Sequence, residues 1–285
     1  MIEKEEVASI VDFMNNSNDL SEKKIQLVWL GQAGFAMRYG NSLILIDPYL
    51  SDYLSKKYKG KIFPHIRLME PPIKSEELKY VDYVCCSHPH SDHMDPETVT
   101  PISHNNPHCR FIVPGPEIEE AAKRGINTDQ IIPAYVRQTI NLNEHIKITP
   151  IPAKHEEFKT NQANEHSYLG YIFHINDKIL YHSGDSIPYD ELSQLLDDYN
   201  VTIALMPING RDEYRLDNGI SGNFKIPEVL DLCRKTKIKT LIVHHFGMFA
   251  YNTATKEELE YLENFHDLNL EIIIPKINYI YTIKT

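Results

Sequence analysis

One short segment of the chain holds an unusual density of metal-ligand side chains. Residues 87–93 read Ser-His-Pro-His-Ser-Asp-His. Three imidazoles and a carboxylate suit borderline divalent cations such as zinc or manganese. The chain has 14 histidines in 285 residues, so an isolated His-x-His pair would carry little weight. The full pattern carries far more, and it predicts a metal-binding loop with these ligands: His88, His90, Asp92 and His93.

The segments on either side of this loop predict a strand and a helix. Residues 81–86 are apolar and partly β-branched, which is typical of a buried strand. Asp95 suits the N-cap of a helix, and Pro96 suits its first position. The ligands therefore lie on a turn between a buried strand and a helix. Such a turn can converge side chains that a strand would send to opposite faces.

Three later segments, each after a predicted strand, offer the remaining ligands. They supply His155, Asp185 and either His244 or His245. A loop that follows a strand projects its side chains over the edge of the sheet, where they can meet. Asp47 also ends an early strand, and we expect it to support the metal loop by hydrogen bonding rather than to bind a metal.

The order of predicted elements indicates a layered α/β fold. Residues 35–46 and 168–182 read as hairpins, and strands alternate with helices over residues 202–265. No linker-like Gly/Ser stretch is present, so we expect a single domain over residues 1–285. Apolar residues at helical spacing predict an N-terminal helix within residues 1–20 that packs on this domain.

Composition narrows the partners of the chain. The net charge is −11 and no Lys/Arg block is long enough for a nucleic-acid groove, which favours a small-molecule substrate over nucleic acid. The sequence has no run of about 18 or more apolar residues, so we expect no membrane span. The acidic N-terminus does not resemble a signal peptide, and the four cysteines form no CxxC motif, so we expect a cytoplasmic protein with reduced thiols. Homo-oligomerisation is left open.

Several segments in chain order resemble the metallo-β-lactamase superfamily, over about residues 25–283. Within it they look most like the L-ascorbate-6-phosphate lactonase group. The resemblance implies a four-layer αββα sandwich and a dinuclear hydrolase. The segments are LGQAGF (30–35), IDPYLSD (46–52), SHPHSDH (87–93), the lone His155, YHSGDS (181–186) and HHFGMF (244–249).

The resemblance also implies a role for each ligand. His88, His90 and His155 would bind the first metal, and Asp92, His93 and His245 the second. Asp185 would bridge both metals together with a hydroxide that attacks a carbonyl carbon or a phosphorus atom. Asp92 or Asp185 would return a proton to the leaving group. His245 is preferred because His-Phe-Gly-Met-Phe matches the family frame, although His244 stays open.

The function predicted from these features is hydrolysis of a lactone or phosphoester of a small anionic metabolite, with two zinc or manganese ions. Arg211, Asn209 and His166 are candidate substrate contacts, and a surface ion pair is the alternative for Arg211. The lactonases are longer and lack a histidine at the place of His155. The resemblance therefore supports the fold and the metal site of this chain better than it supports a lactone as its substrate. The alternatives are a phosphodiesterase or nuclease, which would need a basic exosite, and a non-catalytic metal-binding module.

Overall fold

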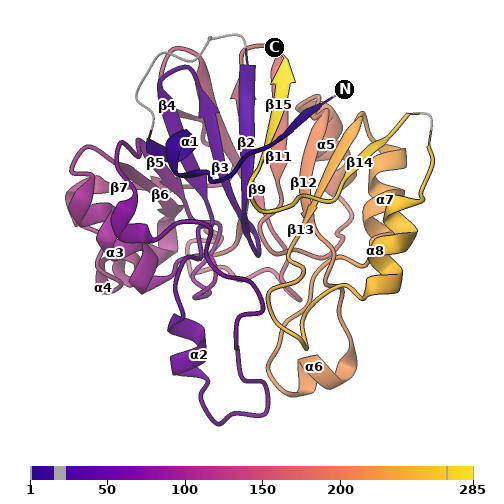
Figure 1. Cartoon of the computed structure of the whole chain (residues 1–285), viewed down its shortest axis with the longest axis horizontal. Coiled ribbons are helices and arrows are strands. Elements are labelled where there is room, and N and C mark those ends of the chain that lie inside the picture. The colour runs from indigo at the N-terminus through magenta and orange to yellow at the C-terminus, as the bar shows by residue number, and fades with distance from the viewer. Residues whose placement is uncertain (1, 16–23, 268, 285) are drawn as a thin grey trace. The chain divides into compact units, whose positions relative to one another are not determined.

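The computed structural model (Figure 1) describes residues 2–15, 24–267 and 269–284. Its contacts group into two compact units. The N-terminal unit comprises Met1–Pro133, Met248–Tyr251 and Lys276–Thr285. The C-terminal unit comprises Ala134–Gly247 and Asn252–Pro275. The expectation of a single domain stays a prediction.

An eight-stranded mixed sheet forms the centre of the N-terminal unit. The predicted hairpin is confirmed, because β3 and β4 pair antiparallel with Phe35 opposite Ile46. The strands β4, β5 and β6 are parallel, so their carboxyl ends meet at one edge of the sheet, where Asp47 follows β4 and residues 87–93 follow β5. The strand order is β1 (Glu3–Glu6), β15 (Tyr279–Lys284), β2 (Lys24–Gly31), β3 (Gly34–Tyr39), β4 (Ser42–Ile46), β5 (Tyr83–Cys85), β6 (Arg110–Pro114) and β7 (Ile131–Ala134).

Helices of the N-terminal unit close a core against this sheet. Asp95 caps α3 by accepting a hydrogen bond from the amide of Glu97, and Pro96 opens the helix as predicted. The core joins Val99 and Ile102 of α3 to Val84 of β5 and to residues of β2, β3, β4 and β6. The helices are α1 (Val11–Asn15), α2 (Tyr53–Lys57), α3 (Pro96–Asn105) and α4 (Ile118–Lys123), with short 3-10 turns at Ser75–Glu77, Gly115–Glu117 and Thr128–Gln130.

The N-terminal helix predicted within residues 1–20 is only partly present. Glu3–Glu6 is a strand that pairs antiparallel with β15, and the helix is limited to Val11–Asn15. Residues 16–20 lie outside the described part. The prediction missed the strand because its pairing partner lies at the other end of the chain. Ile10 and Met14, which gave the helical spacing, are fully buried in the core.

A seven-stranded mixed sheet forms the centre of the C-terminal unit. The second predicted hairpin, between β10 and β11, is confirmed. The strands β11 to β14 are parallel, so Asp185 after β11, Asn209 after β12 and His245 after β13 all follow strand ends at the same edge. The strand order is β14 (Glu271–Ile273), β13 (Thr240–His244), β12 (Ile203–Pro207), β11 (Lys178–His182), β10 (Leu169–Ile175), β9 (Ile146–Pro152) and β8 (Ile140–Asn141).

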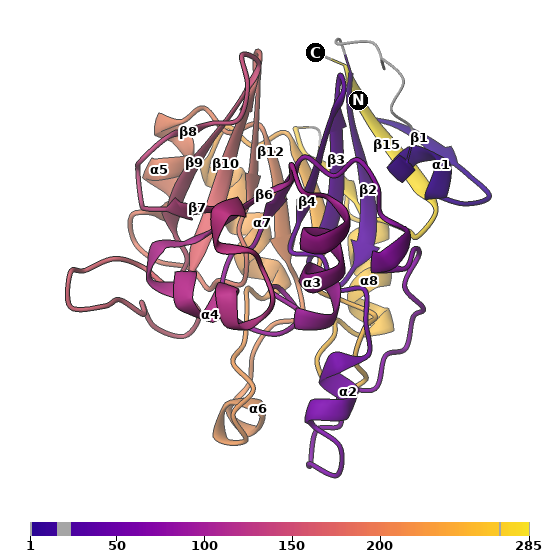
Figure 2. The ribbon, with the colours of Figure 1, turned by 90° about the vertical axis from the view of Figure 1, so that its left-hand side faces the viewer.

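Helices α7 and α8 lie beside β13 and β14 (Figures 1 and 2). Val229 and Leu230 are among the residues that α7 buries, as expected of an amphipathic helix. None of the helices in the described part of the chain has the length and hydropathy needed to cross a membrane. The helices of this unit are α5 (Leu192–Asp198), α6 (Glu213–Asp217), α7 (Ile226–Lys235) and α8 (Lys256–Glu263).

Candidate metal centre

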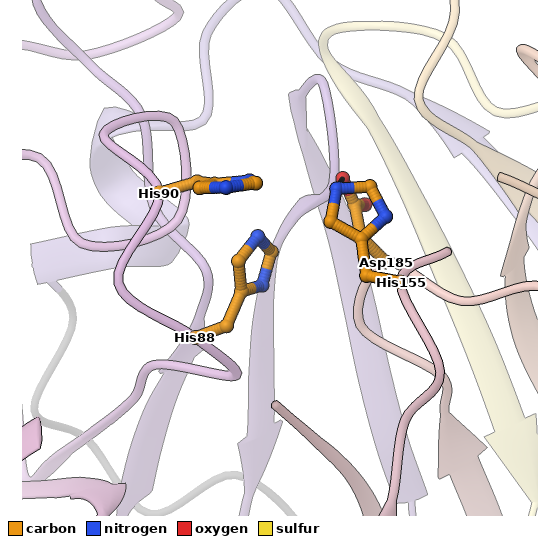
Figure 3. Close-up of side chains that lie close together, drawn as sticks. All are labelled: His88, His90, His155 and Asp185. Atoms are coloured by element: carbon orange, nitrogen blue, oxygen red, sulfur yellow. Dashed lines mark ion pairs between the residues drawn. The ribbon is translucent and has the colours of Figure 1, made fainter. Parts of the chain in front are cut away.

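The N-terminal unit brings four of the predicted ligands together on the loop after β5, which we call the metal loop (residues 87–93). The ligand atoms of His88 and His90 lie within 4.8 Å of each other, as do those of Asp92 and His93. The ring centroids of His88 and His93 are 4.0 Å apart, and Figure 3 shows the rings of His88 and His90 beside each other. The turn thus converges the side chains, as the sequence predicted.

Asp47 anchors the metal loop from the end of β4. Its Oδ1 accepts a hydrogen bond from the Ser87 amide at 2.7 Å, and its Oδ2 accepts one from the Ser87 hydroxyl at 2.6 Å. The same Oδ2 lies 2.8 Å from Nδ1 of His93. Asp47 has a φ of 44°, a left-handed conformation that few residues other than glycine adopt without strain. All three side chains are fully buried, so the anchor is shielded from water.

These contacts determine which imidazole nitrogen of each histidine is available to bind a metal. Asp47 can only accept hydrogen bonds when ionised, so Nδ1 of His93 carries the proton and Nε2 is the donor atom for a metal. The Ser87 hydroxyl gives its one proton to Asp47, so it accepts from Nδ1 of His88, which lies 2.9 Å away. Both histidines therefore present Nε2.

Gln32, which the sequence showed only as part of the LGQAGF segment, is a functional candidate. Its Nε2 donates to Oδ2 of Asp92 at 2.8 Å. Gln32 is fully buried and has a φ of 51°, and the preceding Gly31 has a φ of 91°. A φ of 91° is a backbone conformation that L side chains rarely adopt, so the turn favours glycine at position 31. The sequence feature that could have identified Gln32 is a polar residue within the otherwise apolar LGQAGF segment.

The C-terminal unit brings the other three predicted ligands together around one carboxylate. Oδ2 of Asp185 lies 3.8 Å from Nε2 of His155 and 3.3 Å from Nε2 of His245. All three residues are buried. Figure 3 shows Asp185 and His155 side by side. Asp185 therefore contacts the two histidines that the resemblance assigns to different metals.

His155 is oriented in the same manner as His93. Its Nδ1 lies 3.0 Å from the carbonyl oxygen of Gly222, which can only accept, so Nδ1 carries the proton and Nε2 is the donor atom. Hydrogen bonds of this kind from a ligating histidine to a carbonyl or carboxylate fix the ring and raise its basicity as a ligand.

The adjacent histidines at the end of β13 have different environments. His244 is the last strand residue, and its ring stacks on His182 at a centroid distance of 4.8 Å and an interplanar angle of 5°. His245 begins the turn with a φ of 60°, and it is this residue that reaches Asp185. The left-handed turn thus separates the two rings.

The three candidate substrate residues lie in the C-terminal unit and already have protein contacts. Arg211 forms a bidentate ion pair with Glu228, at 2.7 and 2.6 Å, which is the alternative that the sequence offered. Asn209 lies in a buried amide network with Asn223 and Asn252. His166 packs edge-on against Phe158, and burial lowers its pKa. A substrate role for these residues stays a prediction.

The donor sets of both units fit divalent metal ions. Each combines buried imidazoles with a carboxylate, which suits zinc and manganese. The orientation of the rings also fits, because the contacts of Nδ1 of His93 with Asp47 and of Nδ1 of His155 with the Gly222 carbonyl leave Nε2 as the atom that would bind a metal.

Comparison with known proteins identifies the family. The model of the family described as Beta-lactamase superfamily domain matches residues 43–246. A UPF0173 metal-dependent hydrolase of Hyperthermus butylicus is 25% identical over 257 residues, which cover 89% of this chain and 97% of that protein. A second, of Mesorhizobium japonicum, is 23% identical over 270 residues, which cover 91% and 100%.

Solved structures share the fold at low identity. Igni18, a metallo hydrolase of Ignicoccus hospitalis, superposes with a TM-score of 0.65 at 18% identity, covering 92% of this chain and 99% of that one. An isothiocyanate hydrolase from Delia radicum gut bacteria superposes with a TM-score of 0.69 at 17% identity, covering 91% and 98%. The predicted metallo-β-lactamase fold is thus confirmed. The chain belongs to the β-lactamase superfamily, and the relatives described above are metal-dependent hydrolases.

Proposed function

We propose that the chain is a dinuclear metal-dependent hydrolase that opens a lactone or phosphoester of a small anionic metabolite. The observation that carries the proposal is the position of Asp185. A single carboxylate oxygen lies 3.8 Å from His155 and 3.3 Å from His245, in one buried cluster. A carboxylate that serves only to cap a turn would not need two histidine neighbours with their Nε2 atoms toward it.

The ligand assignment follows the superfamily pattern. We assign His88, His90 and His155 to a first ion and Asp92, His93 and His245 to a second, with Asp185 between them. Seven ligands exceed what one tetrahedral ion takes, which supports two ions. Zinc and manganese both suit the mixed imidazole and carboxylate set.

Each part of the site has a defined task. Bound divalent ions supply a water activated near neutral pH and a counter-charge for the developing oxyanion. Asp92 and Asp185 are the carboxylates that can accept a proton and return it to the leaving group. The hydrogen bond from Gln32 to Oδ2 of Asp92 holds this carboxylate in position. Asp47 and Ser87 hold the metal loop in place during the reaction.

The substrate class follows from the charge that two cations would place at the site. The similarity to the isothiocyanate hydrolase is one of fold, so it does not choose an electrophile for this chain. A lactone and a phosphoester both develop negative charge on oxygen in the transition state, and two cations would stabilise either one.

Two measurements test the proposal. Elemental analysis after saturation with zinc or manganese should approach two equivalents per chain. The metal-loaded protein should then hydrolyse at least one member of a panel of sugar lactones, phosphodiesters and phosphorylated sugars, and the chelated protein and the Asp185→Asn variant serve as controls. A ceiling of one equivalent would sink the dinuclear assignment. Equal turnover by the loaded and chelated protein would sink the metal chemistry.

A further inference from the structure

Residues 51–70 form an arm that contributes Leu54 to a small buried core. In Figure 1 helix α2 lies on this arm, which extends from the sheet of the N-terminal unit. Tyr49, Leu54 and Phe249 are buried together at the base of the arm, with Met248 beside them. His65 stacks on Tyr58 at a centroid distance of 4.1 Å. These contacts anchor α2 and the base of the arm, whereas Ile62, Ile66 and Leu68 further along it are exposed.

Arg67 ties the two ends of the arm together. Its guanidinium donates to the carbonyl oxygens of Tyr49 at 3.1 Å, Ser51 at 3.2 Å and Met69 at 3.1 Å. It also lies over the ring of Tyr49, 4.7 Å from the centroid. These contacts fix the position of α2, which begins at Tyr53.

The last residue of α2, Lys57, contacts the metal loop. Its ammonium donates to the hydroxyl of Ser91 at 3.0 Å, and Ser91 stands between the ligands His90 and Asp92. The same ammonium lies over the rings of Tyr53 and Tyr58, at 5.9 and 5.5 Å from their centroids. Within the described residues, no carboxylate lies within ion-pair distance of Lys57. The neighbouring Lys56, in contrast, pairs with Glu97 at 2.7 Å.

A cation in this position works against the binding of metal ions. Burial lowers the pKa of Lys57, and Arg124 lowers it further, whereas Asp92 and Glu120 raise it. Arg124 is already paired with Glu120 at 2.8 Å. Divalent ions beside the same loop would add like charge near Lys57. An anion that approaches the loop would relieve this repulsion, because it attracts both the ammonium and the metal ions.

We propose that Lys57 is a substrate-binding residue that recognises a phosphate or another anionic group of the substrate beside the metal loop. The inference rests on the proposed function, and in that function Lys57 would determine which substrates bind. A lysine is suited to this task, because its ammonium acts as a compact point charge toward phosphate. The rings of Tyr53 and Tyr58 hold the ammonium near the loop in advance, which reduces the entropy lost when the anion binds.

The test measures the binding of inorganic phosphate to the metal-loaded protein by calorimetry, in parallel with the metal content of each variant. Lys57→Met should weaken phosphate binding about tenfold at unchanged metal content, as expected for loss of one charge-assisted contact. Lys57→Arg should restore most of the binding. Lys56→Met is the matched control, since it removes the same charge one residue away and should change the affinity less than about twofold. The loss in Lys57→Met should shrink as the salt concentration rises.

A second variant separates recognition from a structural role. Ser91→Ala removes the hydrogen bond to the loop but keeps the ammonium, so it should retain phosphate binding. The proposal is overturned if Lys57→Met binds phosphate as the unmodified protein does. It is also overturned if Ser91→Ala loses as much affinity as Lys57→Met, or if the loss follows a loss of metal. None of these results decides the proposed function, because the metal count and the hydrolysis of the substrate panel test it independently of phosphate binding.

Discussion

Oδ2 of Asp47 lies 2.8 Å from Nδ1 of His93, and this contact links the end of β4 to the far end of the metal loop. The same carboxylate holds both the amide and the hydroxyl of Ser87 at the start of the loop. One side chain thus sets both ends of the segment that carries four candidate ligands. A carboxylate that orients a ligating imidazole also raises its basicity.

Asp47→Asn should therefore weaken metal binding by about 10- to 100-fold, since an amide is a weaker and partly wrongly polarised partner for Nδ1 of His93. Metal titration followed by a chromophoric chelator measures the effect. Asp82→Asn is the matched control, because Asp82 is also an acceptor in this unit but bonds to the amide of Leu43. Equal metal affinity in Asp47→Asn and the unmodified protein would show that the anchor does not act on the metals.

Asp185→Asn should remove most hydrolysis and lower the number of bound metals while the fold persists. The proposed bridging role would need both carboxylate oxygens and a full negative charge, and an amide supplies neither. Circular dichroism and a thermal melt check the fold, and elemental analysis checks the metal content. Turnover at the unmodified rate would reduce Asp185 to a turn residue.

Gln32→Met should weaken the binding of the second metal ion by roughly tenfold, because Asp92 loses one hydrogen bond that holds its carboxylate. Methionine keeps the length of the side chain and can fill the same buried space. Gln130→Met is a suitable control, since Gln130 is a buried glutamine of the same unit that bonds to Ser103 and Asn106. Both variants should lose some stability, and only Gln32→Met should lose metal affinity.

The local patterns of the chain predicted much of the fold. The hairpins at β3–β4 and β10–β11 were legible from alternation and turn residues, and α7 occupies Ile226–Lys235, the helix that the sequence indicated. The site residues were legible for a related reason. Polar residues directly after parallel strands gather at one sheet edge, so ligands distant in sequence could be grouped by position alone.

What the sequence did not reveal depends on partners far along the chain. Glu3–Glu6 is a strand only because β15 provides its pairing edge. Lys57 reads as one of several lysines in a solvated loop until the arm places it on Ser91. Arg211 could be assigned to a substrate or to an acid, and only the fold shows Glu228 beside it.

The four cysteines should respond slowly to thiol reagents in the folded protein. All four are buried, and burial raises the pKa of Cys233 to about 12 and raises the pKa of Cys85, Cys86 and Cys109 as well. The thiolate is the reactive form, so its scarcity and inaccessibility both slow the reaction. A chromogenic disulfide reagent should titrate four thiols in denaturant, and a fast-reacting thiol in the native protein would contradict the burial.

The same raised pKa values predict how stability varies at alkaline pH. Unfolded thiols lose their protons near pH 8.5, whereas the folded protein keeps them, so the folded state binds more protons above that pH. The free energy of unfolding should then fall as pH rises, by up to about 1.4 kcal/mol per pH unit for each such thiol. Denaturant unfolding of the unmodified protein and Cys233→Ala at several pH values isolates the share of Cys233. Parallel pH curves for the two proteins would count against it.

The adjacent histidines after β13 give the sharpest test of the second metal site. His245→Ala should lose the second ion, because His245 is the residue that reaches Asp185 at 3.3 Å. His244→Ala should keep both ions and lose stability by about 1–3 kcal/mol, because it removes the ring stacked on His182 and leaves a buried gap. The two variants differ by one position and remove the same side chain, so each controls for the other. If His244→Ala loses the second ion and His245→Ala keeps it, the ligand is the neighbouring residue and the dinuclear proposal still stands. If neither variant loses an ion, neither histidine is a ligand, and the second site must be built without them.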